Sequence, residues 1–148
     1  MTARAAWPLQ LAALLGMVHG LVSLYWAAGG DWLLSTLGER LVATFADMRW
    51  LLAPVGLVKL GFAWLPLLLV SRSWPHRRWW RPLCWCGAAV LIVWGGLNTV
   101  VGNLVLAGAV RPHGGYDHAG MVGHAWLWDP LFLAWGLALA VGLVRSRR

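Results

Sequence analysis

The sequence predicts an all-α membrane protein: a four-transmembrane-helix bundle with a short amphipathic interfacial helix between spans 1 and 2. Its 148 residues are 60% hydrophobic and only 11% charged, which leaves too little polar surface to cover a water-soluble domain. The apolar residues form four long runs, each close to the ~20 residues that a membrane helix needs. These runs use most of the chain, so residues 1–148 are expected to form a single integral membrane domain in the lipid bilayer.

The first span is expected at about residues 7–28 and contains His19, Ser23 and Tyr25. Arg4 before the run and the small residues that follow it are also features of a cleavable signal peptide, which is the alternative interpretation. The run is longer than a usual signal core, and this favours a membrane span.

Residues 31–48 carry an amphipathic pattern rather than a continuous apolar run. Leu34, Leu37, Leu41, Phe45 and Met48 recur at helical spacing, with acidic residues on the other faces. A helix this charged does not cross the bilayer. We expect it to lie in the outer interface over the bundle, with a solvated connector as the alternative.

The remaining spans are expected at about residues 51–70, 83–110 and 121–144. Each contains polar residues or a proline: Lys59 and Pro66, where a kink is expected, in the second span; Asn98, Thr99 and Asn103 in the third; and His124, Asp129 and Pro130 in the fourth. Asp is a good N-cap and Pro a favoured first helical residue, so the fourth helix is expected to be broken at Asp129.

Basic residues predict the orientation of the spans, because cytoplasmic loops are enriched in Arg and Lys. One side of the predicted membrane carries Arg4, Arg72, Arg77, Arg78, Arg81, Arg145, Arg147 and Arg148, and the other carries Arg40, Arg49 and Arg111. Both termini are therefore predicted to be cytoplasmic, with a basic turn at residues 71–81. The net charge of +7 does not indicate nucleic-acid binding, because the basic residues flank apolar runs and do not line one polar face.

Ionisable groups inside the hydrocarbon are costly and need a partner or a wet cavity. At a rise of about 1.5 Å per residue, Lys59 and Asp129 both lie roughly 12 Å below the outer starts of their helices. His19 and Asn103 fall close to the same level. One interpretation is a structural Lys59–Asp129 ion pair that fixes the helix packing, and the other is the floor of a pocket open to the outside.

The candidate ligand-binding residues share the outer half of the bundle: His19, Tyr25, Lys59, Asn103, His124 and Asp129. We expect them to bind an apolar or lipid-like ligand, a second copy of the chain or a partner membrane protein. The alternative is a membrane enzyme of isomerase or cyclase type, for which the catalytic candidates are Asp129, His19, His124 and Lys59. A small transporter subunit is the third possibility.

No cofactor and no metal site are expected. His19 and His124 do not match in depth as haem ligands require, and His113, Asp117 and His118 lie in a glycine-bearing loop whose side chains are expected to be solvated. Cys84 and Cys86 are interpreted as packing residues with free thiols, since a bridge between them would be strained.

Two segments resemble a known family when taken together: residues 19–32 (HGLVSLYWAAGGDW) and residues 123–136 (GHAWLWDPLFLAWG). They are similar to small bacterial four-helix membrane proteins grouped as domain of unknown function 3995. Many members have a tyrosine and a serine before the proline of the fourth helix, where this chain has Trp128 and Asp129. The resemblance implies a bacterial plasma membrane and no particular activity, cofactor or catalytic residue.

Overall fold

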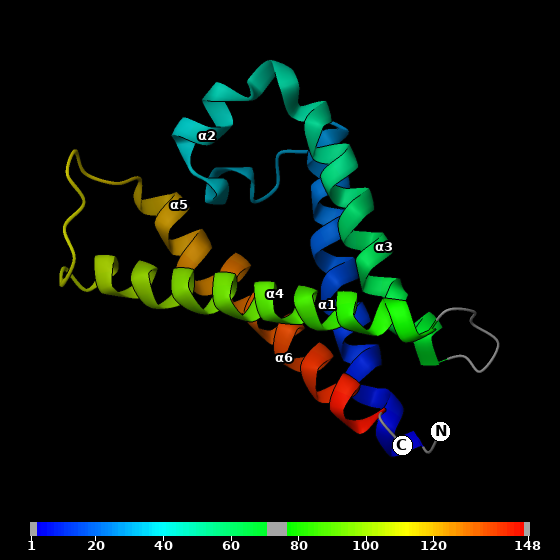
Figure 1. The fold of residues 1–148 in the computed structure, drawn as a ribbon. Coiled ribbons are helices and arrows are strands. Elements are labelled where there is room, and N and C mark those ends of the chain that lie inside the picture. The colour runs from blue at the N-terminus through cyan, green and yellow to red at the C-terminus, as the bar shows by residue number, and fades with distance from the viewer. Residues whose placement is uncertain (1–2, 71–76, 147–148) are drawn as a thin grey trace.

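The computed structural model describes residues 3–70 and 77–146. Within them, four long helical stretches cross the molecule (Figure 1): α1 (Ala3–Ala27), α3 (Leu52–Val70), α4 (Arg77–Leu106), and a fourth built from α5 (His118–Gly123), the π turn η3 (His124–Trp128) and α6 (Asp129–Arg145). The segments long and apolar enough to span a membrane are Trp7–Ala27, Ala46–Leu68, Trp79–Leu106 and His118–Arg145. The chain is a multi-pass membrane protein by helix length and hydropathy, and the predicted all-α class is confirmed.

Local backbone signals explain where the third and fourth stretches differ from expectation. Helix α4 ends at Leu106, shortly before Gly108, which adopts a left-handed φ of 74°. Helix α5 begins at His118, because the Asp117 side chain accepts hydrogen bonds from the N–H groups of Ala119 and Gly120, both at 3.1 Å. Of the predicted basic turn at 71–81, residues 71–76 lie outside the described residues, and residues 77–81 do not form a turn but the start of α4.

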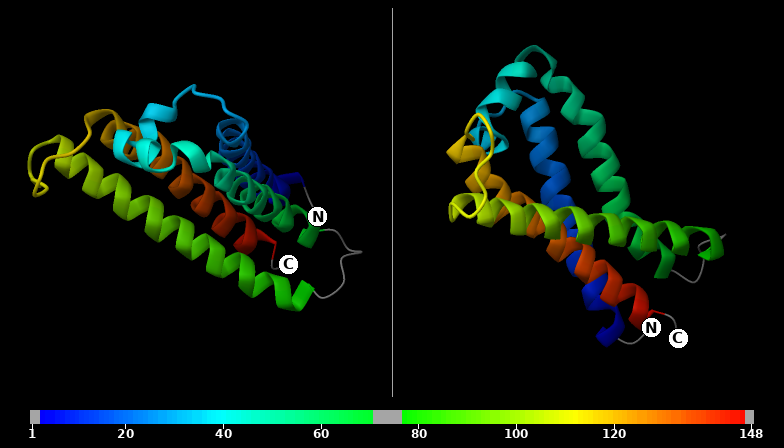
Figure 2. Two further views of the ribbon diagram at one scale, coloured as in Figure 1. Left: turned by 90° about the horizontal axis from the view of Figure 1, so that it is seen from above. Right: turned by 60° about the vertical axis from the view of Figure 1, so that its left-hand side comes forward.

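The helices pack in the spatial order α3, α1, α6, α4, and the extensive contacts are between neighbours in that order. Figure 2 shows α3 beside α1 and α4 beside α6 from two further directions. Glycines allow the closest approaches. A Cβ on Gly56 of α3 would lie 2.9 Å from the carbonyl oxygen of Gly20 in α1, and a Cβ on Gly95 of α4 would lie 2.5 Å from the backbone N of Leu133 in α6.

Two clusters of buried side chains fill the bundle. The larger surrounds Trp135 and includes Leu9, Leu139 and Leu143. It lies toward the end of the bundle where α1 begins and α6 ends. There the Arg145 guanidinium lies 5.5 Å from the Trp7 ring centroid, and Arg81 Nη2 donates to the Leu143 carbonyl at 2.6 Å. We call this the terminal end and its opposite the distal end.

The smaller cluster, at the distal end, consists of Trp26, Leu34 and Trp128. Over it lies the distal segment, defined as residues 29–51, which contains η1 (Leu34–Leu37), α2 (Glu39–Thr44) and η2 (Ala46–Leu51). A short helix between spans 1 and 2 was expected, but the expected single helix over residues 31–48 is divided. Gly38 adopts a φ of 102°, which interrupts the helix between η1 and α2.

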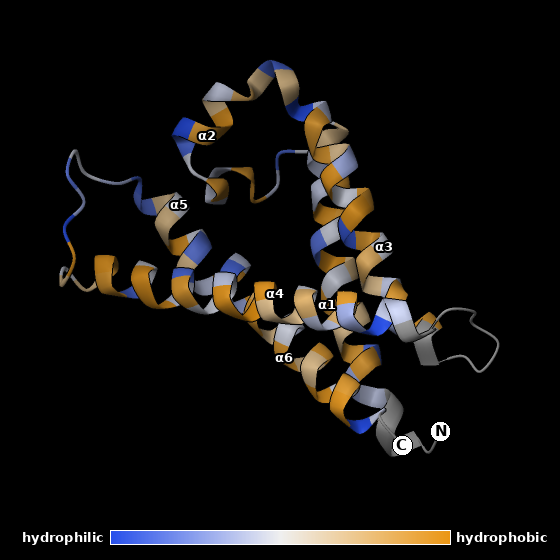
Figure 3. Ribbon diagram, in the orientation of Figure 1, coloured by the Kyte–Doolittle hydropathy of each residue, from blue (hydrophilic) through white to orange (hydrophobic). Residues whose placement is uncertain are grey.

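The distal segment is fixed to the rest of the protein by specific hydrogen bonds. Trp128 Nε1–H donates to Thr36 Oγ1 at 2.9 Å, and the Glu39 N–H donates to Asp117 Oδ2 at 2.9 Å. Its own ends are joined by Arg49, whose Nη2 donates to Asp31 Oδ1 at 2.7 Å. Figure 3 shows that hydrophilic residues concentrate in this segment and in the loop after α4, while the long helices are mainly hydrophobic.

Candidate functional site

The candidate site is built around the π turn η3, where the fourth helical stretch changes its hydrogen-bond pattern. The Asp129 N–H donates to the carbonyl of His124. In the same i to i+5 pattern the carbonyl of Ala125 would face Pro130, which has no N–H to donate. Asn103 Nδ2 from α4 lies 3.5 Å from this carbonyl oxygen and also donates to the Thr99 carbonyl at 2.7 Å. The predicted break at Asp129 is therefore wrong, because the fourth helical stretch continues past Asp129 through a π turn.

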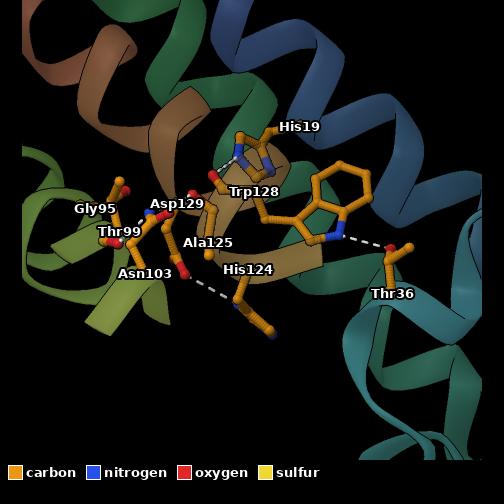
Figure 4. Close-up of polar contacts among 9 residues, drawn as sticks. All are labelled: His19, Thr36, Gly95, Thr99, Asn103, His124, Ala125, Trp128 and Asp129. Atoms are coloured by element: carbon orange, nitrogen blue, oxygen red, sulfur yellow. Dashed lines mark hydrogen bonds and ion pairs between the residues drawn. The ribbon is translucent and has the colours of Figure 1, made fainter. Parts of the chain in front are cut away.

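Asp129 does not cap a helix but pairs with His124 (Figure 4), and the distance between His124 Nδ1 and Asp129 Oδ2 is 3.1 Å. The Asp129 side chain is 2% exposed, whereas the His124 side chain is 43% exposed. When Asp129 is ionised it can only accept, and Nδ1 is then the donor. The buried Asp129 carboxylate thus fixes the orientation of the half-exposed His124 imidazole.

His124 and Asp129 line a cleft of about 310 Å³ between α4 and the π turn. The other walls are mostly apolar and come from Trp94, Val101 and Met121, and Asn98 adds an amide group. A concave apolar surface with a few convergent polar groups is the usual form of a small-molecule site. Sequence reasoning did not select Asn98 as a site residue, although its position inside an apolar run was a usable signal.

His19 lies outside this cleft, on the side of the fourth helical stretch that faces α1. Its Nε2–H donates to the Trp128 carbonyl at 3.1 Å, and its ring stacks on Phe132 with centroids 3.9 Å apart. Lys59 of α3 is close by. Its Nζ donates to Ser23 Oγ at 3.1 Å and lies 5.3 Å from the Phe132 ring centroid.

The predicted Lys59–Asp129 ion pair is wrong. Among residues 7–68 and 79–146, whose side chains the structure describes, the ion pairs are Arg49 with Asp31 and His124 with Asp129. Helix α1 lies between α3 and α6, and Phe132, one turn after Asp129, is the residue of α6 that faces Lys59. The expected single polar layer is thus divided into a Lys59–Ser23–His19 group and a His124–Asp129 group.

The remaining predicted site residues are Asn103 and Tyr25, and only Asn103 lies near the cleft. Asn103 lies beside the π turn, next to the cleft, as described above. Tyr25 does not reach it, because its hydroxyl accepts the Trp32 N–H at 3.3 Å in the turn that begins the distal segment.

Asp117, considered above as part of a loop with two histidines, has a structural role. Its carboxylate accepts the backbone N–H of Glu39 as well as those of Ala119 and Gly120. These backbone hydrogen bonds, first of all that from Glu39, hold the pKa of Asp117 below its usual value. The residue therefore connects the start of α5 to the distal segment.

Comparison with known proteins identifies one family. Residues 16–139 match the family model described as a protein of unknown function, DUF3995. Neither the curated proteins nor the solved structures gave a match.

Proposed function

The chain belongs to the DUF3995 family, and we propose that it binds an amphipathic, lipid-like ligand in the cleft between α4 and the π turn. The observation that carries this proposal is the His124–Asp129 pair in the wall of a cleft that is otherwise mostly apolar. The ligand's apolar part contacts Trp94, Val101 and Met121. Its polar end, a hydroxyl or carbonyl group, meets the half-exposed imidazole of His124.

The proposed setting is one integral membrane domain in a bacterial plasma membrane, with both termini cytoplasmic and the cleft nearer the outer surface. The contacts of Arg145 with Trp7 support a common side for the start of α1 and the end of α6. The excess of arginine at the terminal end supports the cytoplasm for that side. Reporter fusions that place the C-terminus outside would contradict this orientation.

Access to the cleft tests the binding proposal. In a background with Cys84→Ala and Cys86→Ala, we expect Asn98→Cys to react with a small charged thiol reagent in purified protein. A monoacylglycerol, used as the probe amphiphile, should slow that reaction. Trp135→Cys should stay unreactive, because Trp135 is 1% exposed in the core. An Asn98 position that never reacts, or that no probe protects, would contradict the proposal.

The role of the polar pair is tested in the same assay. Asp129→Asn should leave the labelling rate at position 98 unchanged but should weaken protection by the monoacylglycerol, because the imidazole loses the carboxylate that orients it. An alkene of the same chain length, which lacks hydroxyl and ester groups, serves as the control and should protect poorly in both proteins. Equal protection by both compounds would show that the polar pair does not recognise the ligand.

The second candidate function is acid–base catalysis on a lipid-like substrate, and the same pair favours it. A buried carboxylate that orients a half-exposed histidine can position that histidine to accept and return a proton. Among the catalytic candidates this favours His124, which is half-exposed and paired with Asp129, over His19, which is 4% exposed. Lipid profiles of cells that express the wild type and Asp129→Asn distinguish the two: an enzyme changes the profile, whereas a binding protein leaves it unchanged.

A further inference from the structure

Asn98 lines the cleft from α4, whereas His124 and Asp129 line it from the fourth helical stretch. Asn98 lies inside the candidate membrane span Trp79–Leu106 and is partly exposed. Its side chain forms no hydrogen bond with any residue that the structure describes. The cleft therefore contains an accessible amide group for which the fold supplies no partner.

The neighbouring polar residues of α4 differ from Asn98 in this respect. Thr99 Oγ1 donates to the Gly95 carbonyl at 2.6 Å, and Asn103 Nδ2 donates to the Thr99 carbonyl at 2.7 Å. Asn98 also lines a groove on the surface of α4 beside Trp94. The hydrocarbon of a bilayer has no hydrogen-bonding groups to offer there, and an unmatched amide in it is costly. A partner for the Asn98 amide is therefore to be sought in the cleft.

The hydrogen-bonding groups of the cleft restrict what that partner can be. A carboxamide provides two N–H donors and one carbonyl acceptor. In the function proposed above, one polar group of the ligand contacts His124. A hydroxyl group has a single proton to donate, so a ligand with one hydroxyl cannot also satisfy Asn98 on the other wall. A second hydroxyl beside the first supplies the additional donor and acceptor.

The charge of the cleft favours an uncharged ligand. Asp129 already places one carboxyl group in the wall. Two carboxylates at close range disfavour each other's ionised forms, and the same applies to a phosphate beside a carboxylate. A hydroxyl group carries no such penalty.

We propose that Asn98 is a second recognition residue of the cleft, and that the ligand is an uncharged lipid with two adjacent hydroxyl groups at its polar end, as in a monoacylglycerol. This inference rests on the proposed function and narrows its ligand class. One hydroxyl contacts His124 and the other contacts the Asn98 amide, while the apolar chain lies against Trp94, Val101 and Met121. Asn98 thereby distinguishes a diol from a simple alcohol.

The test uses the full-length protein in nanodiscs with a photoactivatable monoacylglycerol that carries a diazirine in its acyl chain. Three lipids of one chain length compete with this probe: a vicinal diol, a primary alcohol and a fatty acid. We expect the diol to reach half-maximal competition at about one-fifth of the alcohol concentration, as one net hydrogen bond implies. The fatty acid should compete less well than the diol.

Substitutions assign the diol preference to one residue. Asn98→Leu keeps a similar volume but removes the amide, so the diol should lose its advantage while the alcohol competes as before. Thr99→Val is the matched control, because it removes a hydroxyl from the next residue, which does not line the cleft. This variant should keep the preference of about fivefold. Asp129→Asn should weaken competition by both lipids and leave their ratio unchanged.

Equal competition by the diol and the alcohol in the wild type, or a diol preference that survives Asn98→Leu, would overturn the role of Asn98. Stronger competition by the fatty acid than by the diol would overturn the uncharged ligand class. Both results are compatible with lipid binding in the cleft. If no lipid competes and the probe does not crosslink to the cleft, the proposed function itself is wrong, and this inference is wrong with it.

Discussion

The contact between α4 and the start of α6 gives the sharpest test of the packing that positions Asp129. A Cβ added at Gly95 would lie 2.5 Å from the Leu133 backbone N and 2.6 Å from the Asp129 carbonyl oxygen. Backbone atoms cannot rotate away as a side chain can. The next residue provides the control, since a Cβ at Gly96 would meet only Leu133 Cδ1 at 3.7 Å, an ordinary contact.

Gly95→Ala therefore requires α4 and α6 to separate by about 1 Å, the difference from a normal contact of about 3.5 Å. Overpacking of this kind costs about 1–3 kcal/mol. Both alanine variants gain the same helix propensity, roughly 0.5–1 kcal/mol, so the difference between them isolates the contact. We expect Gly95→Ala to be less stable than Gly96→Ala by about 1–3 kcal/mol.

The assay is reversible unfolding in mixed micelles as the fraction of a denaturing detergent is raised, followed by circular dichroism and tryptophan fluorescence. Both variants and the wild type are compared at the same detergent composition. Equal stability of the two variants, or a larger loss for Gly96→Ala, would refute the close approach of α4 to the backbone of α6.

Three further predictions concern the polar contacts. Thr36→Val removes the acceptor of the buried Trp128 indole N–H and should lower the free energy of unfolding by about 1–3 kcal/mol in the same assay. Thr36→Ser keeps a hydroxyl acceptor and should therefore lose much less stability. Lys59→Met and Asp129→Asn should be additive within about 0.5 kcal/mol, because these residues are not partners; a larger coupling would contradict the division of the polar groups. Because the folded state lowers the pKa of Asp117, the ionised carboxylate stabilises the fold at pH values above the ordinary aspartate pKa of about 3.9, and this stabilisation is lost as the pH falls through the folded-state pKa. Hydrogen exchange of the distal segment should therefore become faster in acid. Asp117→Asn should make that exchange less dependent on pH.

The existence and order of the helices could be predicted because apolar runs of membrane length leave little choice. The division of the distal segment could not, since the Leu34 to Met48 pattern fits one continuous helix. Gly38 was a visible signal, but glycine inside a helical pattern is often tolerated. What decides its φ of 102° is the docking of η1 onto α5, a tertiary effect.

For the candidate site, the sequence predicts how far along its helix each residue lies but not toward which neighbour its side chain points. Rise per residue gave the depths of Lys59 and Asp129. The direction of each side chain around its helix axis depends on which helices are neighbours, and the sequence does not state that α1 separates α3 from α6. The apparent layer was therefore divided, and the true partner of Asp129 was His124, five residues earlier on the same chain.

The π turn also limits how the length of the fourth helical stretch can change. A π turn holds one more residue than an α turn, so it acts as a single-residue insertion that rotates everything before it by about 100° relative to everything after it. Gly123, which faces Thr36 of the distal segment, and Gly136, which faces Ile92 of α4, are correctly phased only while that extra residue is present. A chain one residue shorter between these glycines would restore a regular helix but could satisfy only one of the two surfaces.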